Sequence, residues 1–552
     1  MYERRLDGVL FCRLLKGGYA ALKRNAEEIN DLNVFPIPDG DTGDNMCATM
    51  YGAVAAADGA NGPLGETAER VSRGMLLGAR GNSGVILSRL FAGIASRLQG
   101  TDTADIEELG AAVCEGVKYA YAAVSNPTEG TMLTVLRCAA KYAAEAIGED
   151  SSLESYFSDF AKEAEAVLEQ TPEMLPILKE AGRVDSGGAG IVCIADGMLK
   201  ELRGENTAVG EEVAATVAPA GDVFSAFNEN SVLQFGYCTE FLLQLTHAKT
   251  DIAAFSMAKF KAKLEKLGES IVAFQTGTVV KVHVHTMFPS RVLEYAQTFG
   301  EFLNLKIENM MIQHKEQIAP PDRTQSFKKN PVRKPFGVVA VADGAGMTSV
   351  FKELGADVVV DGGMGKNPSV ECFLRAFDAV NAEHIFVLPN HCNIRLAAKE
   401  AAGMFGESDV RVLGSKNMGE GYVALSALDC ATEDVDGIFE AMEAERKNAA
   451  SGMVSRAHRT ADFNERSVKK NDYVGIADKK IVTVCEDKIA AAAELTEKLG
   501  AGERDFVVVF YGKSVADFEK AAYKNAVRKL TDAEFYEMDG GQDVYDFIVV
   551  AQ

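Results

Sequence analysis

The chain has 552 residues, of which 47% are hydrophobic and 25% charged, and this composition excludes wholesale disorder. At about 150 residues per domain, its length also excludes a single compact domain. Its 57 basic and 80 acidic side chains give a formal net charge of −23, which argues against generic binding to nucleic acid or to anionic lipid. No window of about 18 apolar residues predicts a transmembrane segment, and ten scattered cysteines without a CxxC pair indicate a reduced, cytoplasmic protein.

Two stretches have the composition of linkers. Residues 204–222 are small and acidic, and residues 317–335 hold four prolines among basic side chains. They predict a multidomain chain with parts at 1–203, 223–316 and 336–552.

The three parts differ in the periodicity of their apolar residues. The first is rich in alanine and repeats with a spacing near 3.6, as in Leu6, Leu10 and Leu14, which predicts an all-helical domain. The second predicts the order β-α-β-β-α-β, a split βαβ pattern of the α+β class. The third alternates strands with helices, which favours an α/β domain with a parallel sheet; residues 431–552 either continue it or form a second lobe.

The densest polar motif lies in the first part. Three carboxylates, Asp39, Asp41 and Asp44, stand among glycines just before a helix expected to begin near Asn45. Carboxylates packed so closely repel one another unless a hard cation such as Mg²⁺ neutralises them, and free N–H groups at the helix start would suit phosphates. The alternative is a plain turn with Asp44 as the helix N-cap.

Three further glycine-rich loops precede helices in the same part, at residues 78–84, 129–132 and 184–190. Each alone predicts only a helix start. Together they could gather at one end of a helical bundle around one anion. The usual nucleotide-binding fingerprints are absent, and no segment predicts a dedicated lipid tunnel.

The second part offers half of a metal site. His283 and His285 are two residues apart in a predicted strand and so lie on one face, where they could share a Zn²⁺ ion. Cys238 could supply a thiolate if its strand is a neighbour. The alternative is a half-exposed strand with polar histidines and a structural cysteine.

Three polar turns of the third part follow predicted strands, where α/β sheets often bind ligands. They are Asp361-Gly362-Gly363, Asn367-Pro368-Ser369 and Pro389-Asn390-His391. Structural turns are the favoured interpretation, and a partner-binding cleft is the alternative.

Several of these segments carry a family resemblance. NVFPIPDGDTGDNM, GARGNSGVILS, EGTMLTV and VDSGGAGIV resemble the nucleotide-binding domain of dihydroxyacetone kinases and of FakA, the catalytic component of bacterial fatty acid kinase, and the likeness continues through GYCTEF, KVHVHT, DVVVDGGMGKNPS and FVLPNHCNIRLAAKEA. It therefore covers all three parts and favours the FakA-like family.

The resemblance implies that the first part is an α-helical barrel that holds ATP through two Mg²⁺ ions. Asp39 and Asp41 would be the principal metal ligands, with Asn33 and Asp44 as further candidates. The implied phosphate and nucleotide contacts are Thr42, Gly43, Asn45, Met46, Ser83, Gly84, Thr131, Asp185 and Gly188. For the middle part the resemblance implies a zinc ion on Cys238, His283 and His285.

The activity implied by the resemblance is ATP-dependent phosphorylation of a fatty-acid carboxylate, presented by a separate FakB-like acyl-binding protein, to give acyl phosphate and ADP. A homodimer is implied as well. Arg80 is assigned a catalytic role from its setting alone, offsetting charge on the transferred group. The alternatives are phosphorylation of a small hydroxyl substrate such as dihydroxyacetone and a non-catalytic scaffold that responds to nucleotide.

Overall fold

The computed structural model describes residues 4–34, 40–59, 62–205, 237–264, 266–276, 278–309, 325, 327–429, 432, 434–457, 461–463, 466–478 and 480–552. Contacts divide the chain into two compact units, one within Met1–Val213 and Thr324–Gln552 and the other within Ala214–Arg323. The predicted linker at 204–222 lies outside the described residues except for 204 and 205, whereas 325 and 327–335 of the second predicted linker are described, and the first C-terminal strand already begins at Lys334. In the part of the chain that is described, no helix combines the length and the apolar character needed to span a bilayer.

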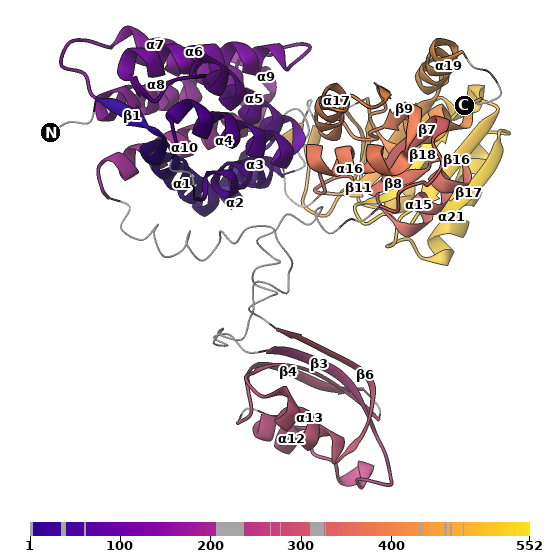
Figure 1. The fold of residues 1–552 in the computed structure, drawn as a ribbon. Helices are drawn as coiled ribbons and strands as arrows, with labels where there is room; N and C mark the ends of the chain where they lie inside the picture. Colours follow the sequence, from indigo (N-terminus) through magenta and orange to yellow (C-terminus); the bar gives the residue numbers. More distant parts are fainter. Residues whose placement is uncertain are drawn as a thin grey trace. The chain divides into compact units, whose positions relative to one another are not determined.

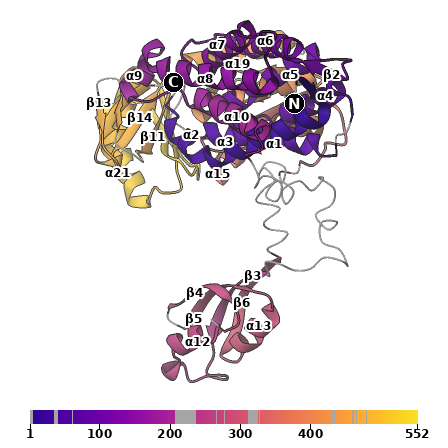
Figure 2. The ribbon, with the colours of Figure 1, turned by 90° about the vertical axis from the view of Figure 1, so that its left-hand side faces the viewer.

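The N-terminal part is helical, as its periodicity predicts. Its helices are α1 Gly8–Arg24, α2 Ala26–Leu32, α3 Thr42–Ala57, α4 Leu64–Gly78, α5 Gly81–Arg97, α6 Ile106–Ala122, α7 Met132–Glu145, α8 Leu153–Met174, α9 Pro176–Ala181 and α10 Ser186–Leu202. Helix α1 packs against both α3 and α10 (Figure 2). The expected all-helical composition is not complete, because β1 Arg5–Asp7 and β2 Thr103–Asp105 form an antiparallel pair that buries Leu6 and Ala104.

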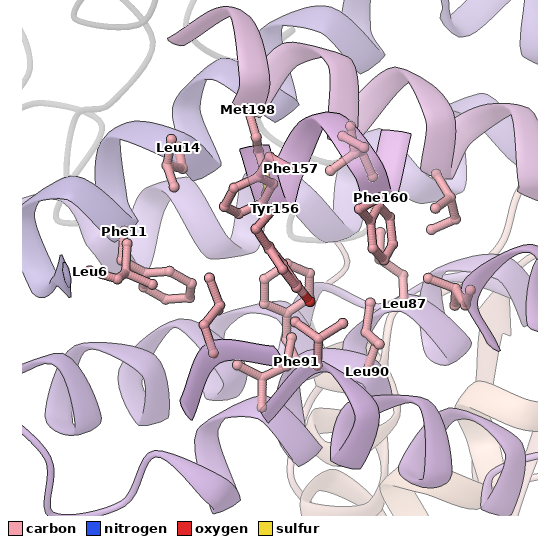
Figure 3. A pocket seen from close by; sticks show the side chains of 17 residues that line it. Leu6, Phe11, Leu14, Leu87, Leu90, Phe91, Tyr156, Phe157, Phe160 and Met198 are labelled. Carbon is pink, nitrogen blue, oxygen red and sulfur yellow. The ribbon is translucent and has the colours of Figure 1, made fainter. Parts of the chain in front are cut away.

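An apolar cavity lies among these helices (Figure 3). Its lining comes from β1 and from six helices and comprises Leu6, Phe11, Leu14, Leu87, Leu90, Phe91, Ile94, Leu109, Val113, Leu136, Tyr156, Phe157, Phe160, Ile191, Ile194, Ala195 and Met198. The hydroxyl of Tyr156 is buried there and has no hydrogen-bond partner within the described structure. The sequence does not predict this cavity, because its lining residues are spread over nearly 200 positions and form no local motif.

The middle part has the predicted element order. Its elements are β3 Tyr237–Leu245, η2 Ile252–Ala254, α12 Met257–Leu264, β4 Glu269–Thr276, β5 Val279–Thr286, α13 Pro289–Gln297 and β6 Gly300–Asn309. The strands form an antiparallel sheet in the order β4-β5-β3-β6. Figure 1 shows α12 and α13 on one face of this sheet, where Phe260 and Val292 pack against Phe241 and Val282.

The C-terminal part begins with a parallel sheet, as the alternation of strands and helices predicts. Strands β7 Lys334–Ala342, β8 Val358–Asp361, β9 Ala382–Leu388 and β10 Asp409–Val412 pair in the order β10-β9-β7-β8. The accompanying helices are α15 Ala345–Glu353, α16 Val370–Val380, α17 Ile394–Met404, α18 Met418–Ser426 and α19 Val435–Asn448.

A second sheet completes this part. Its strands run in the order β15-β14-β11-β18-β16-β17 and are β11 Ala450–Arg456, β14 Tyr473–Ala477, β15 Lys480–Cys485, β16 Phe506–Tyr511, β17 Glu534–Asp539 and β18 Tyr545–Ala551. The remaining elements are β12 Ala461–Phe463, β13 Arg466–Val468, α20 Lys488–Lys498, η4 Ala501–Glu503 and α21 Asp517–Leu530. The two sheets share one apolar cluster, in which Val338 and Ala340 join Phe510 and Ile548.

Candidate functional site

The start of α3 differs from the predicted one. The helix begins at Thr42, three residues before Asn45, with Asp41 at the N-cap position but without a capping hydrogen bond to its side chain. Instead, Oδ1 of Asn30 in α2 accepts hydrogen bonds from the N–H groups of Gly43 (2.7 Å) and Asp44 (3.3 Å). The alternative interpretation, in which Asp44 is the helix N-cap, is therefore wrong. The expectation of free N–H groups fails at these two positions, because a side chain from the preceding helix takes them.

The Asp41 carboxylate is left to contact other side chains. It is 6% exposed and accepts hydrogen bonds from Nδ2 of Asn45 (2.9 Å) and from Nδ2 of Asn367. Asn45 lies one turn further along α3, whereas Asn367 belongs to the loop between β8 and α16. Residues 326 positions apart in the sequence thus meet at this carboxylate.

The four glycine-rich loops gather at one end of the helical part, which the sequence left open as one arrangement. The Ser186 hydroxyl at the start of α10 donates to Thr42 Oγ1 (3.1 Å). At the start of α5, Gly81 has a positive φ of 55°, and a Cβ placed on it would lie 2.5 Å from Asn45 Nδ2. Met132, at the start of α7, lies beside Gly187 of α10: a Cβ placed on Gly187 would be 3.1 Å from the Met132 side chain.

Asp185 holds two of these helix starts together. It is the N-cap of α10, where its Oδ2 accepts a hydrogen bond from Gly188 N (2.7 Å). Burial raises the pKa of Asp185 to about 6, while N–H groups of Gly188, Met132 and Gly187 oppose this shift by favouring the charged form. Its carboxylate therefore joins the start of α7 to that of α10.

Several of the expected nucleotide contacts also have packing roles. A Cβ on Gly43 would overlap the backbone oxygen of Ala26, and one on Gly84 would overlap the Thr49 hydroxyl, so both glycines allow close helix packing. Gly188 similarly approaches Val135. These positions need glycine whether or not a phosphate binds beside them.

The other expected contacts lie at the same end of the helices. Met46 is fully buried and packs against Gly190, while Ser83 is half-buried in the first turn of α5. Thr131 is the N-cap residue of α7, and its hydroxyl donates to the Thr128 carbonyl (2.8 Å).

Arg80 is buried at the N-cap position of α5, where its Nη1 donates to the backbone oxygen of Asn367 (3.5 Å). It therefore lies against the loop whose side chain contacts Asp41. Asn33 is buried just before the undescribed segment, and the predicted metal ligand Asp39 lies outside the described residues. Among the residues that are described, no group of three or more His, Cys, Asp or Glu side chains could hold a metal ion.

In the middle part, the strand that carries Cys238 is a neighbour of the strand that carries His283 and His285, as the predicted zinc site requires. Strands β3 and β5 are neighbours, and their register places Cys238 opposite His285 and Glu240 opposite His283. The side chains of the cysteine and both histidines lie outside the described structure.

The polar turn at 367–369 of the C-terminal part has two roles. Ser369 is a structural N-cap, since its Oγ accepts a hydrogen bond from Cys372 N (3.1 Å) in α16. Asn367 reaches Asp41 and was not predicted as a site residue, although its place after a parallel strand is a known signal for a ligand-binding loop. At the third turn, Asn390 has a φ of 53°, and its Nδ2 donates to Val341 O (2.8 Å).

Comparison with known proteins covers all three parts. Residues 36–200 match the DAK2 domain family, residues 234–317 match the middle domain of the FakA-like fatty acid kinase family, and residues 337–552 match the C-terminal region of that same family. Protein YloV of Bacillus subtilis (strain 168) is 36% identical over 566 residues, covering 100% of both chains. An uncharacterized protein of Staphylococcus aureus (strain MRSA252) is 32% identical over 557 residues, covering 98% of both.

Solved structures give only a distant likeness. A fatty-acid-binding DegV family protein from Thermus thermophilus is 14% identical with a TM-score of 0.30, over 40% of this chain and 100% of its own. A DegV family protein from Corynebacterium glutamicum is 15% identical with a TM-score of 0.30, over 39% and 95%.

The three family matches follow one another in the order in which the helical, middle and C-terminal parts occur, and the full-length relatives span the same order. With its helix-start loops assembled inside the DAK2 region, this chain belongs to the FakA-like family of fatty acid kinase proteins.

Proposed function

We propose that this chain is the ATP-dependent catalytic component of a fatty acid kinase. It transfers the γ-phosphoryl group of ATP to a fatty-acid carboxylate presented by a separate, FakB-like acyl-binding protein. The observation that carries this proposal is the gathering of four helix starts, of which that of α3 carries the buried Asp41 carboxylate, within the region that matches the DAK2 family. Asn30 and Asp185 occupy several N–H groups of these helix starts, but the positive ends of the helix dipoles remain, so the convergence of the helix starts suits a polyphosphate.

The oxygen atoms of this junction fit Mg²⁺, which prefers carboxylate and amide oxygens. Asp41 is buried, and the equally buried Asn367 Oδ1 has no hydrogen-bond partner among the described residues. Asp39 and Asp41 are the proposed principal ligands of two Mg²⁺ ions, with Asn33 and Asp44 as further candidates. Bound there with ATP, Mg²⁺ would neutralise negative charge on the phosphates.

The helix starts supply the remaining proposed contacts. Thr42, Gly43, Asn45 and Met46 begin α3, Ser83 and Gly84 begin α5, and Thr131, Asp185 and Gly188 belong to the starts of α7 and α10. In the middle part, the register of β3 and β5 supports a zinc site at Cys238, His283 and His285.

The chemistry needs positioning more than proton transfer. A fatty-acid carboxylate is ionised near neutral pH, so the acceptor needs no general base. One carboxylate oxygen bonds to the γ-phosphorus as the bond from that phosphorus to the β,γ-bridging oxygen breaks, and the electron pair leaves with ADP. Arg80, buried at the start of α5, can offset charge on the transferred group.

The test is the Asp41→Asn variant, with Asp58→Asn as a matched control at the exposed end of the same helix. Acyl phosphate is trapped with hydroxylamine and ADP release is measured, using a fatty-acid-loaded acyl-binding protein as substrate. We expect D41N to lower both products by about a hundredfold or more, because the loss of a proposed Mg²⁺ ligand weakens the neutralisation of charge on the reacting phosphates. D58N should leave both products unchanged.

Near-normal turnover by D41N would contradict the proposed site. Parallel reactions separate the rival functions: ADP release with dihydroxyacetone but not with fatty acid would indicate a small hydroxyl substrate. Nucleotide binding without turnover of either acceptor would indicate a scaffold.

A further inference from the structure

A loop of the C-terminal part lies directly on the helix starts described above. Asn367 Nδ2 donates to Asp41 and, at 3.3 Å, to Oδ1 of Asn45. The backbone of the same loop accepts from Arg80, and Val370 N donates to the backbone oxygen of Ala79 (3.2 Å). The loop thus contacts the starts of both α3 and α5.

This contact belongs to a packed interface. Ala79 and Val85 of the helical part are fully buried in one apolar cluster with Phe373, Ile394 and Ala397 of the C-terminal part. Beside the cluster, Asn82 Nδ2 donates to Asn393 Oδ1 (2.9 Å), and Arg89 forms an ion pair with Glu400, which is 8% exposed. Asn367 is therefore held at the helix starts by more than its own hydrogen bonds.

The loop is also anchored on its own side. Lys366 Nζ lies 2.9 Å from Asp343 Oδ1 and 3.2 Å from Asp543 Oδ2, and Gly363 pairs with Lys366 through backbone hydrogen bonds. The side chain of the next residue, Asn367, then projects to Asp41. Such an anchor limits how far Asn367 can move away from the carboxylate.

Only one of the two polar atoms of the Asn367 amide forms hydrogen bonds in the described structure. Its Nδ2 donates to Asp41 and Asn45, whereas its Oδ1 is buried and accepts no hydrogen bond in the described structure. A buried amide oxygen without a donor is costly, which points to a donor or cation absent here. Carboxamide oxygens are ligands for Mg²⁺ and acceptors for the water molecules that Mg²⁺ retains.

We propose that Asn367 is a positioning residue of the nucleotide–metal site, so that the C-terminal domain completes the site built on the helical domain. Without a cation, its amide nitrogen holds the Asp41 carboxylate. With Mg²⁺ and nucleotide, its amide oxygen serves the cation or a cation-bound water. This inference rests on the proposed function, because it takes Asp41 to be a metal ligand.

The experiment measures binding of a non-hydrolysable ATP analogue with Mg²⁺ by calorimetry, on the full chain and its Asn367→Ala variant. We expect N367A to weaken binding by about tenfold or more, since the bound state loses the buried amide oxygen that faces the cation or a cation-bound water. Asn393→Ala is the matched control: it removes the interface hydrogen bond from Asn82, and we expect less than about a threefold change.

A second variant guards against a simple loss of folding. Asn367→Asp places a carboxylate opposite that of Asp41, so its melting temperature is expected to be low without Mg²⁺ and to rise with added Mg²⁺ more than that of the wild type. No greater rise would contradict the proposal.

The possible binding results separate the two levels of inference. Equal affinity of wild type and N367A would overturn the role of Asn367 and leave the proposed function standing. Tighter binding by N367A would make the contact an obstacle to nucleotide, which also refutes the proposal. Absence of analogue binding to the wild type would overturn both.

Discussion

Replacing Asp185 with asparagine tests whether burial or hydrogen bonding dominates the pKa of the carboxylate at the starts of α7 and α10. The carboxylate is 5% exposed and receives N–H groups from both helix starts, yet burial dominates and raises its pKa from 3.8 to about 6. The variant keeps the shape of the side chain and removes the titrating proton.

The sign follows from proton binding. Between pH 3.8 and about 6 the folded chain keeps the Asp185 proton that the unfolded chain releases, so the free energy of unfolding falls as the pH rises. This contribution is complete below pH 3.8 and lost above about pH 6. One pH unit corresponds to about 1.4 kcal/mol for one proton, so the interval of about two units amounts to about 3 kcal/mol.

The assay is urea unfolding of the wild type and of Asp185→Asn from about pH 4 to about pH 7.5, followed by circular dichroism. Groups that titrate alike in both proteins cancel in the difference, so the wild type should lose about 3 kcal/mol relative to D185N across this range. Asp196→Asn, a partly exposed ion-paired position on α10, should show a much smaller change. A flat difference for D185N, or one of opposite sign, would refute the dominance of burial.

Two further substitutions test the packing of the helical part by thermal unfolding. Tyr156→Phe removes a buried hydroxyl that has no partner in the described structure, so stability should stay constant or rise by about 1 kcal/mol; a clear loss would mean that the hydroxyl is hydrogen-bonded in solution. Gly43→Ala should cost about 1–3 kcal/mol because the new Cβ meets the Ala26 carbonyl, whereas Gly148→Ala, with open space around it, should be near neutral; equal effects would refute the packing role of Gly43.

The gathering of the helix starts was predictable because it follows from local patterns. Each glycine-rich loop precedes an apolar helix, and helices that pack side by side can bring their starts to one end of a bundle. The β-α-β-β-α-β order and the parallel sheet were likewise visible, since both depend on periodicity along a few residues.

Contacts between distant residues account for what the sequence did not predict. Helix α3 begins three residues before the predicted position, and Asn30, on another helix, caps it in place of a nearby aspartate. Asn367 carried only the weak signal of a turn after a strand, and its partner Asp41 is 326 positions away. Neither contact leaves a trace in local composition or spacing.

The choice of asparagine beside Asp41 has a physical logic of its own. A lysine or arginine paired permanently with this buried carboxylate would compete with a divalent cation, and displacing it would leave a second buried charge uncompensated. The amides of Asn45 and Asn367, two of the groups that contact Asp41, donate hydrogen bonds to its carboxylate without adding a positive charge. One amide comes from the helical part and the other from the C-terminal part, so a cation bound at Asp41 would contact or displace groups of both parts. The affinity of the site for the cation should therefore depend on the packing of Ala79 and Val85 against the C-terminal helices.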